Sequence, residues 1–406
     1  MSPEVTGTER DAAIAFVLKF ARALHTYGMP AHRLEEAMGL CAEKLGVPGQ
    51  FFCTPTSIIF AFGRPEEQKG SFLRVEPGEV NLQKLSLLDE VIGGVLGGYV
   101  SPAMGSDRVD RIVSLPAPHP PWLRLLAAGL ASASGARFFG GAWQEVWVAG
   151  VAGVLVGGLA ELTPRRPRIA RVFEPLAAAM ATALVYVAAA FLPISPSVTM
   201  LGSLITLFPG LTLTTAMTEL AVDHLVAGTA RLMGAMVTFL TIGFGVAIGL
   251  KVAAVLTPIG PVLPMEPEEW TLVPALILAP LSFLVLFRAP WRDAVPILVA
   301  GAVAFLAARL GGHLLGAELG GALGAFVVGV GSTVHSRLRN RPMAITSVPG
   351  LMLLVPGSIG FRSITALLAH DVVGGMQTAF RMILVATSLV AGLLLANLIL
   401  RPRRLV

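Results

Sequence analysis

Hydrophobic positions divide the chain into two unlike parts. Over residues 1–118, apolar and polar positions are mixed at helical or strand spacing, whereas residues 121–400 form a train of long apolar segments. A helix of about 20 apolar residues spans the hydrocarbon core of a bilayer, and several of these segments are long enough. The pattern therefore predicts a mainly α-helical membrane protein with a small α/β domain at its N-terminal end.

The N-terminal domain, residues 1–118, combines two periodicities. Apolar residues recur at helical spacing in four stretches, and two stretches between them are rich in aromatic and β-branched residues. The predicted helices are 10–26, 31–46, 81–98 and 101–113, and the predicted strands are 50–63 and 70–75. We expect the polar loop "RPEEQK" to join the two strands.

The apolar part contains ten segments that could cross a membrane. They are 122–140, 143–161, 172–192, 196–222, 228–256, 271–288, 293–310, 313–333, 342–370 and 372–400. Two of them, 196–222 and 342–370, are interrupted by Pro-Gly. The expected domains are residues 119–260 and 261–406, with five helices each.

Basic residues alternate between the loops in the way that the positive-inside rule requires. One set of loops and the C-terminus hold Arg165, Arg166, Arg168, Arg171, Arg231, Arg288, Arg292, Arg337, Arg339, Arg341, Arg401, Arg403 and Arg404. The alternate loops "GGAW" and "PISP" are uncharged, and "PVLPMEPEEW" holds three glutamates and no basic residue. Arg309 and Arg362 are exceptions. The alternation predicts ten crossings, with both termini in the cytoplasm.

Composition supports the membrane interpretation and limits the partners. Apolar residues make up 54% of the chain and charged residues 14%, and the mean hydropathy is +0.75. A soluble domain carries about 25% charged residues. The high isoelectric point does not indicate nucleic acid, because the basic residues collect beside membrane segments. Cys41 and Cys53 are the only cysteines, so no disulfide framework is expected.

The two Pro-Gly interruptions lie in similar surroundings. "TLFPGLTLTTAMTELAVDHLVAG" at 206–228 and "LLVPGSIGFRSITALLAHDVVGG" at 353–375 share an apolar run, Pro-Gly, hydroxyl residues, an acid beside a histidine, and glycine. Pro209 and Pro356 are 147 positions apart, as are Gly228 and Gly375. An odd number of helices in each half would turn the second half upside down, which predicts two inverted five-helix repeats with broken fourth helices.

A break of this kind is suited to binding a small anion. Proline and glycine interrupt the helix and leave backbone groups that lipid cannot satisfy, so the break should face protein or a wet cavity. The N-terminus of the half-helix that follows attracts a carboxylate. The residues expected to bind substrate are Pro209, Gly210, Thr212, Thr214, Thr215, Thr218, Pro356, Gly357, Ser358 and Ser363. The alternative is that the hydroxyls bond to their own helices.

Two acids follow the first break and are candidates for proton coupling. Glu219 and Asp223 are spaced i, i+4 and would share a helical face. Acids inside a membrane segment are costly and point to proton relays or to ligands for an ammonium group. The alternative is a solvated helix end at the cytoplasmic interface near Arg231.

The N-terminal domain offers little support for catalysis. His25, His32, Glu35 and Glu36 could suggest a metal site, but Gly28 and Pro30 break the register between the histidines. The sequence contains no known metal, phosphate-binding or nucleophile motif. We therefore expect no metal, no cofactor and no enzyme.

Several ordered stretches resemble the threonine/serine exporter family. They are "HTYGMPAHRLEEAMGLCAEKLGV", "PTSIIFAFG", "FFGGAW", "LFPGLTLTTAMTELAVDHLVAGTARL" and "SVPGLMLLVPG", and the resemblance extends over residues 12–398. It implies a ten-helix exporter of small amino acids in the cytoplasmic (inner) membrane, driven by the proton gradient. Glu219 stands where the resemblance leads us to expect aspartate.

Three main functions remain open at this point, and a passive channel, which could not transport uphill, is a fourth. The first is a proton-coupled exporter of threonine, serine or a similar solute, with protons and the lipid bilayer as its other partners and with a homo-oligomer left open. The second is a dicarboxylate exporter, in which Arg362, Arg231 or Arg381 would serve the second carboxylate. The third is a membrane-anchored hydrolase that acts through the N-terminal domain.

Overall fold

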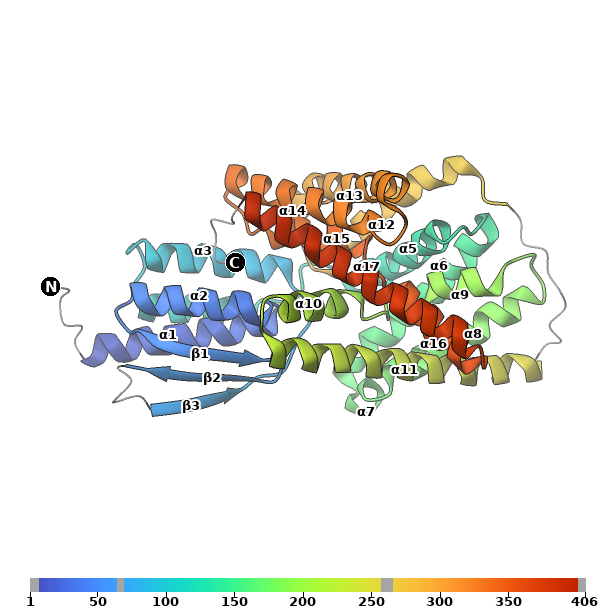
Figure 1. Ribbon diagram of the computed structural model, residues 1–406. Helices are drawn as coiled ribbons and strands as arrows, with labels where there is room; N and C mark the ends of the chain where they lie inside the picture. The colour runs from blue at the N-terminus through green and yellow to red at the C-terminus, as the bar shows by residue number, and fades with distance from the viewer. Residues whose placement is uncertain (1–6, 64–68, 257–265, 401–406) are drawn as a thin grey trace.

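The computed structural model describes residues 7–63, 69–256 and 266–400. The molecule is elongated, with a small domain at one end and a bundle of helices over the rest of its length (Figure 1). Residues 64–68 of the predicted loop, the first half of "PVLPMEPEEW" (261–265), and the C-terminal Arg401, Arg403 and Arg404 lie outside the described residues.

The N-terminal domain is a mixed α/β structure, as the periodicity predicts. Its helices are α1 (Gly7–Thr26), α2 (Ala31–Lys44), α3 (Leu82–Leu96) and α4 (Pro102–Ser114), and its strands are β1 (Gly49–Thr54), β2 (Ser57–Phe62) and β3 (Lys69–Arg74). The strands form one antiparallel sheet in the order β1-β2-β3.

The single strand predicted over residues 50–63 is wrong, because the chain turns in its middle. Pro55 has no N–H to give to a strand ladder, and Thr54 Oγ1 accepts a hydrogen bond from Ser57 N at 3.0 Å. The result is the hairpin β1-β2, in which Cys53 faces Ile58. Both side chains are buried, so the hairpin turns one face of the sheet towards the helices.

The remaining helices form the bundle. They are α5 (Pro121–Phe138), α6 (Trp143–Leu162), α8 (Phe173–Ala189), α9 (Pro196–Ser203), α10 (Gly210–Ala221), α11 (Leu225–Leu256), α12 (Leu272–Leu286), α13 (Ala294–Leu315), α14 (Gly320–Arg339), α15 (Ala344–Met352), α16 (Gly357–Leu368) and α17 (Val372–Ile399). Short turns are η1 (Thr163–Arg165), α7 (Pro167–Ala170), η2 (Glu269–Thr271) and η3 (Trp291–Asp293).

Six helical segments in the described part of the chain are long and apolar enough to cross a membrane. They are Trp143–Arg165, Leu225–Leu256, Glu269–Leu286, Trp291–Leu315, Ala344–Leu368 and Val372–Ile399. Phe173–Ala189 is a shorter apolar helix. The protein is therefore a polytopic membrane protein, while the count of ten crossings stays a prediction.

Both predicted interruptions are confirmed, and they are built alike. The half-helices α10 and α16 begin at Gly210 and Gly357, directly after a proline, and each has 12 residues. Each ends before a left-handed residue, Asp223 or His370, with φ of 63° in both. The similarity seen in the sequence is therefore also a similarity of backbone conformation.

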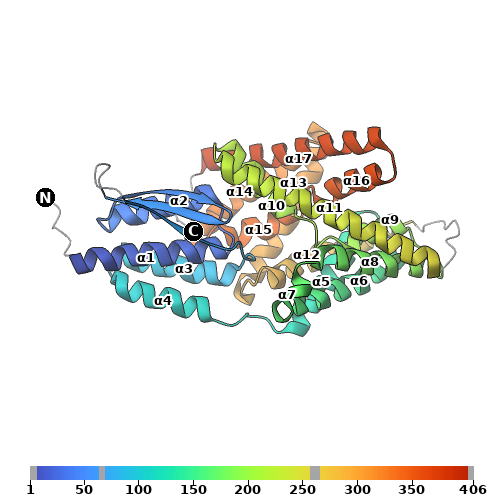
Figure 2. The same cartoon turned by 90° about the horizontal axis from the view of Figure 1, so that it is seen from below.

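The two interrupted segments run in opposite directions along the molecule. In Figures 1 and 2, α10 lies nearer to the N-terminal domain than α9 does, whereas α16 lies farther from this domain than α15. The half-helices that follow the breaks therefore extend to opposite ends of the bundle.

The N-terminal domain and the bundle share one apolar core. Leu284, Ala289 and Ile345 of the bundle are fully buried in the same cluster as the core of the domain. Helix α3 also docks through its backbone, because Leu82 N donates to the carbonyl oxygen of Phe287 at 3.0 Å. The domain is thus packed onto the bundle rather than tethered to it.

This shared core predicts that a change in the bundle will destabilise the N-terminal domain. Replacing fully buried Ile345 with alanine should cost about 2–5 kcal/mol, because it leaves a cavity. Cys41 and Cys53 are both buried, so the temperature at which a fluorogenic maleimide labels them reports unfolding of this domain. We expect Ile345→Ala to lower that temperature clearly, and Val237→Ala on an exposed face of α11 to change it little. If Ile345→Ala lowers only the melting of the helices and leaves thiol labelling unchanged, the shared core is refuted.

Candidate functional site

The two Pro-Gly breaks meet near the middle of the bundle. A Cβ atom built on Gly357 would lie 3.6 Å from Gly210 Cα and 2.9 Å from Phe208 Cβ. A Cβ atom on Gly210 would lie 2.2 Å from Val355 Cγ1. The absence of a side chain at both glycines is therefore what allows the two backbones to approach so closely.

Aromatic packing holds the meeting point together. The ring of Phe208, just before the first break, stacks on the ring of Phe361 in α16 with centroids 5.0 Å apart. Phe208 also contacts the ring of Phe239 in α11 at 6.4 Å. Offset aromatic pairs at such distances are favourable, so each break is fixed by rings from both halves of the chain.

The breaks leave backbone donors free. The first N–H groups of a helix have no acceptor within the helix. Over the described residues, the N–H groups of Leu211, Thr212, Gly357 and Ser358 have no hydrogen-bond partner. Regular bonding resumes with Leu213 N to Pro209 O and Gly360 N to Pro356 O. Two helix N-termini, each with a partial positive charge, thus come together at one place.

A cavity of about 280 Å³ lies beside this place. Its walls come from α5, α12, α13 and both interrupted segments. They are lined by five phenylalanines (Phe138, Phe139, Phe208, Phe283 and Phe305) and by residues 352–359. Pockets for drug-sized ligands measure roughly 300–1,000 Å³. The volume therefore suits a small solute.

The structure brings only part of the predicted substrate site to this cavity. Gly210, Pro356, Gly357 and Ser358 line it. Pro209 is the cap of α10 and does not line the cavity.

The hydroxyl groups farther along the half-helices lie elsewhere. Thr214 Oγ1 donates to Gly210 O at 3.1 Å, Thr218 Oγ1 to Thr214 O at 2.9 Å, and Ser363 Oγ to Gly375 O at 2.7 Å. Thr212 is exposed and Thr215 is half-buried, and neither lines the cavity. For Thr214 and Thr218, the structure thus shows the alternative reading, in which these hydroxyls bond to their own helix.

Thr206, within the first break, is a residue that the sequence analysis missed. Its hydroxyl is buried and has no hydrogen-bond partner among the described residues. No sequence signal distinguishes it from the other threonines, because its position depends on the irregular backbone between α9 and α10.

Glu219 is fully buried, but it does not face the cavity. Its carboxylate accepts a hydrogen bond from Ala31 N, at the start of α2, at 2.8 Å. Arg231 Nε lies 3.1 Å and 3.0 Å from its two oxygens. The acid therefore joins α10, α11 and the N-terminal domain in one contact.

Asp223 does not share a helical face with Glu219, contrary to the expectation from their spacing. Helix α10 ends at Ala221, and Asp223 takes a left-handed conformation in the turn before α11. Aspartate tolerates this conformation better than most residues. Its side chain is exposed, so only one of the two acids is buried.

Histidines and a glutamate extend this interdomain contact. His224 Nε2 lies 3.1 Å from Glu35 Oε2, and Glu35 Oε1 accepts a hydrogen bond from Cys53 N at 2.6 Å. The ring of His32 packs edge-on against that of His224, with centroids 5.9 Å apart. Glu35 and His32, which the sequence analysis considered only for a metal site, thus dock the N-terminal domain on the turn between α10 and α11.

Comparison with known proteins identifies the family. Apolar spans with paired helix breaks are typical of secondary transporters. One family profile, described as "Putative threonine/serine exporter", matches residues 15–253, and a second, described as "Threonine/Serine exporter, ThrE", matches residues 273–399. The chain belongs to the threonine/serine exporter family, which confirms the resemblance seen in the sequence. This is a family of transporters.

The chain is also similar to several fungal proteins named pheromone-regulated membrane protein 10. It is 27% identical to the protein of Debaryomyces hansenii over an alignment of 369 positions, which covers 86% of this chain and 36% of the relative. For Kluyveromyces lactis the identity is 26% over an alignment of 421 positions, which covers 95% of this chain and 43% of the relative. The chain thus spans less than half the length of these curated relatives. No solved structure matches it.

The close approach of the breaks predicts a specific pattern of mutational effects. Gly210→Ala should cost about 1–3 kcal/mol and impair function, because its methyl group collides with Val355. Val355→Ala removes the colliding atom. The destabilisation of the double variant should therefore be about 1 kcal/mol smaller than the sum of the destabilisations of the two single variants. Gly234→Ala, where the added atom meets nothing within 4 Å, serves as the control and should not lower the thermal midpoint. Simple additivity of the two changes would contradict the contact.

Acid should weaken the folded protein, because His32 is buried in its neutral form. Burial, reinforced by the charge of Arg33, lowers the pKa of His32 from 6.5 to about 4. Between these two values the unfolded chain binds more protons than the folded chain, so stability decreases as the pH falls from 6.5 to 4. The full difference corresponds to about 3 kcal/mol.

Circular dichroism melts at several pH values would measure this loss. Replacing His32 with asparagine should flatten the slope of midpoint against pH in this window, and replacing exposed His313 with asparagine should not. An unchanged slope in His32→Asn would show that other groups cause the pH dependence.

Proposed function

We propose that this protein is a secondary active exporter of threonine, serine and similar small amino acids, and that it binds its substrate between the two Pro-Gly breaks. The observation that carries the proposal is the approach of Gly210 and Gly357, which places two helix N-termini beside one small cavity. Membership of the threonine/serine exporter family supports the substrate class.

The cavity has the chemistry that a small zwitterion needs. The free N–H groups of Gly357 and Ser358, which line the cavity, would receive the carboxylate, with the N-terminus of α10 at Gly210 beside them. The carbonyl groups released at the ends of α9 and α15 would receive the ammonium group. The surrounding phenylalanine rings exclude water and limit the length of the side chain.

The packing of the bundle supports an inverted repeat of two five-helix units, residues 119–260 and 261–406. Helix α10 packs on α11 and α17, and α16 packs correspondingly on α17 and α11; α8 packs on α11 as α14 packs on α17. With ten crossings and both termini in the cytoplasm, the repeats would rock against each other around the breaks, as in other transporters with this plan.

Glu219 is the better of the two proton-coupling candidates. Protonation of its carboxylate would remove the charge that pairs with Arg231 and would weaken the hydrogen bond from Ala31 N. Breaking one partner of a buried pair is strongly unfavourable unless the structure rearranges. Because α10 is a single helix with Glu219 at one end and Gly210 at the other, protonation would bias both the docked N-terminal domain and the substrate site.

A dicarboxylate is the second candidate cargo. The guanidinium of Arg362 lies 5.9 Å from the ring of Phe139, which lines the cavity, and could serve a second carboxylate. The other two arginines considered for this task are occupied: Arg231 pairs with Glu219, and Arg381 pairs with Glu318 at 3.1 Å.

The N-terminal domain gives no support to a hydrolase. Burial raises the pKa of Cys41 to about 12 and raises that of Cys53 still more. Both thiols therefore stay protonated and buried, and they are poor nucleophiles.

Reconstitution in proteoliposomes tests the proposal. Labelled threonine should show counterflow and pH-gradient-driven efflux, unlabelled serine should compete, and succinate should not. Glu219→Gln should lower the gradient-driven flux at least about tenfold, because an amide cannot take up the proton, and should retain counterflow.

Asp223→Asn is the matched control and should keep both activities, because its side chain is exposed at a turn. If succinate competes with threonine and transport depends on Arg362, the dicarboxylate is favoured as the cargo. If only Asp223→Asn uncouples transport from the pH gradient, the proton is carried by Asp223 and not by Glu219.

A further inference from the structure

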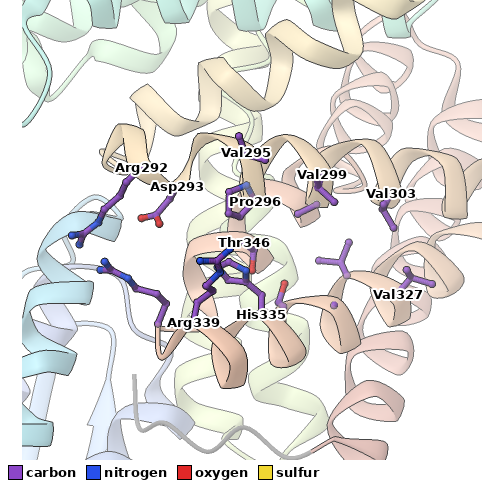
Figure 3. A pocket seen from close by; sticks show the side chains of 15 residues that line it. Arg292, Asp293, Val295, Pro296, Val299, Val303, Val327, His335, Arg339 and Thr346 are labelled. Carbon is purple, nitrogen blue, oxygen red and sulfur yellow. The ribbon is translucent and has the colours of Figure 1, made fainter.

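A second and larger cavity, of about 710 Å³, lies between α13 and α14, away from the Pro-Gly breaks. Figure 3 shows that polar and apolar side chains line different parts of its length. Charged and polar side chains lie at the end nearest the N-terminal domain, and valines lie at the opposite end. An elongated site with one ionic end and one apolar end fits an amphiphilic molecule.

The polar end carries three arginines, Arg292, Arg339 and Arg341. Arg341 is held in place by α3, because its Nη1 atom donates to Ser86 Oγ at 3.1 Å and lies 3.6 Å from a Glu90 oxygen. No ion pair of Arg292 or Arg339 occurs among the described residues. The cavity therefore presents guanidinium groups that can bind a phosphate.

Buried polar atoms at the same end lack partners. Within the described part of the chain, Asp293 Oδ2, Ser332 Oγ and His335 Nε2 have no hydrogen-bond partner. Asp293 and Ser332 are only 5% and 2% exposed, and all three residues line the cavity. Leaving buried polar groups unsatisfied is costly, so these atoms mark a place where a polar ligand can bind. A carboxylate beside arginines suits a ligand that carries hydroxyl donors as well as an anionic group.

The apolar end continues as a groove along α13. Val295, Val299 and Val303 are spaced i, i+4, i+8 and therefore form a stripe of about 12 Å. They are 69%, 57% and 39% exposed, and they lie in Trp291–Leu315, a segment apolar enough to cross a membrane. Trp291, at the end of this segment, is also exposed and is of the type that sits at the membrane–water interface. The groove thus opens where acyl chains lie.

We propose that the α13–α14 cavity is a binding site for an anionic phospholipid. The phosphate binds to the three arginines, hydroxyl groups of the headgroup donate to Asp293, and one acyl chain lies along the valine stripe. Basic pockets between membrane helices bind such headgroups. Because Arg341 also contacts α3, the bound lipid lies next to the contact between the bundle and the N-terminal domain.

Native mass spectrometry of the detergent-purified full chain tests the site, with phosphatidylglycerol and phosphatidylcholine of the same acyl chains as probes. We expect one phosphatidylglycerol to bind at concentrations at which phosphatidylcholine does not. The double variant Arg292→Gln/Arg339→Gln should weaken this binding about tenfold or more. Arg165→Gln/Arg168→Gln removes the same charge from exposed positions at and beside α7, which lies away from α13 and α14 in Figures 1 and 2, and should have little effect.

A second variant fills the groove without changing charge. A side chain at Gly331 meets nothing within 4 Å of its Cβ atom, and Gly331 lines the cavity. Gly331→Leu should therefore fold normally and weaken lipid binding by a similar factor, whereas Gly234→Leu, equally free of neighbours on α11, should not. The labelling temperature of Cys41 and Cys53 confirms that the variants are folded.

Three results would overturn the proposal. Equal binding of both lipids would remove the role of the headgroup charge. Equal weakening by the two arginine pairs would reduce the effect to general surface charge. Displacement of the lipid by millimolar inorganic phosphate, together with full binding to Gly331→Leu, would show a site for free phosphate rather than for a lipid.

Discussion

Backbone groups that lose their helical partners cannot be left in lipid, and this constraint governs the centre of the molecule. Each Pro-Gly break frees donors and carbonyls within an apolar segment. In the structure, the two breaks pack against each other, with glycine at both contact points and the stacked rings of Phe208 and Phe361 beside them. Because each break lies in a different half of the chain, the two halves must come together for either to be stable.

The same arrangement connects the centre to the N-terminal domain. Helix α10 begins at the break and carries Glu219 in its last turn, where the carboxylate is held by Ala31 of α2 and by Arg231 of α11. Around it, His32, His224 and Glu35 extend the contact between the N-terminal domain and the bundle. A proton taken up by Glu219, as proposed, would act on the docking of the domain rather than on a direct contact with substrate. In the proposed exporter, the domain would therefore regulate access to the site.

Local features could be predicted from the sequence where one periodicity dominates. The helices of the N-terminal domain and both interruptions follow from apolar spacing and from the chemistry of Pro209-Gly210 and Pro356-Gly357. The prediction of one strand over residues 50–63 failed because the run of β-formers conceals a turn at Pro55. The prediction that Glu219 and Asp223 share a helical face was wrong, because spacing alone does not reveal that the helix ends between them.

Contacts between distant parts of the chain could not be predicted in this way. Glu35 and His224, or Ala31 and Glu219, are almost 190 residues apart, and no pattern connects them. Likewise, five of the predicted hydroxyl residues lie outside the cavity, because side-chain direction depends on where the half-helix starts. The polar end of the cavity between α13 and α14 likewise includes Arg341, which contacts Ser86 of α3, 255 residues away in the sequence.

The central claim is that substrate lies between the two breaks, and Ser358 offers the most direct test because it lines the cavity in the described structure. Ser358→Cys can be alkylated in proteoliposomes with a small maleimide, with Ser197→Cys at the exposed start of α9 as the control. The account predicts that threonine slows alkylation at position 358 over the same concentration range in which it drives counterflow, and leaves position 197 unaffected. Alkylation of Ser358→Cys at an unchanged rate in saturating threonine, with counterflow intact, would contradict it.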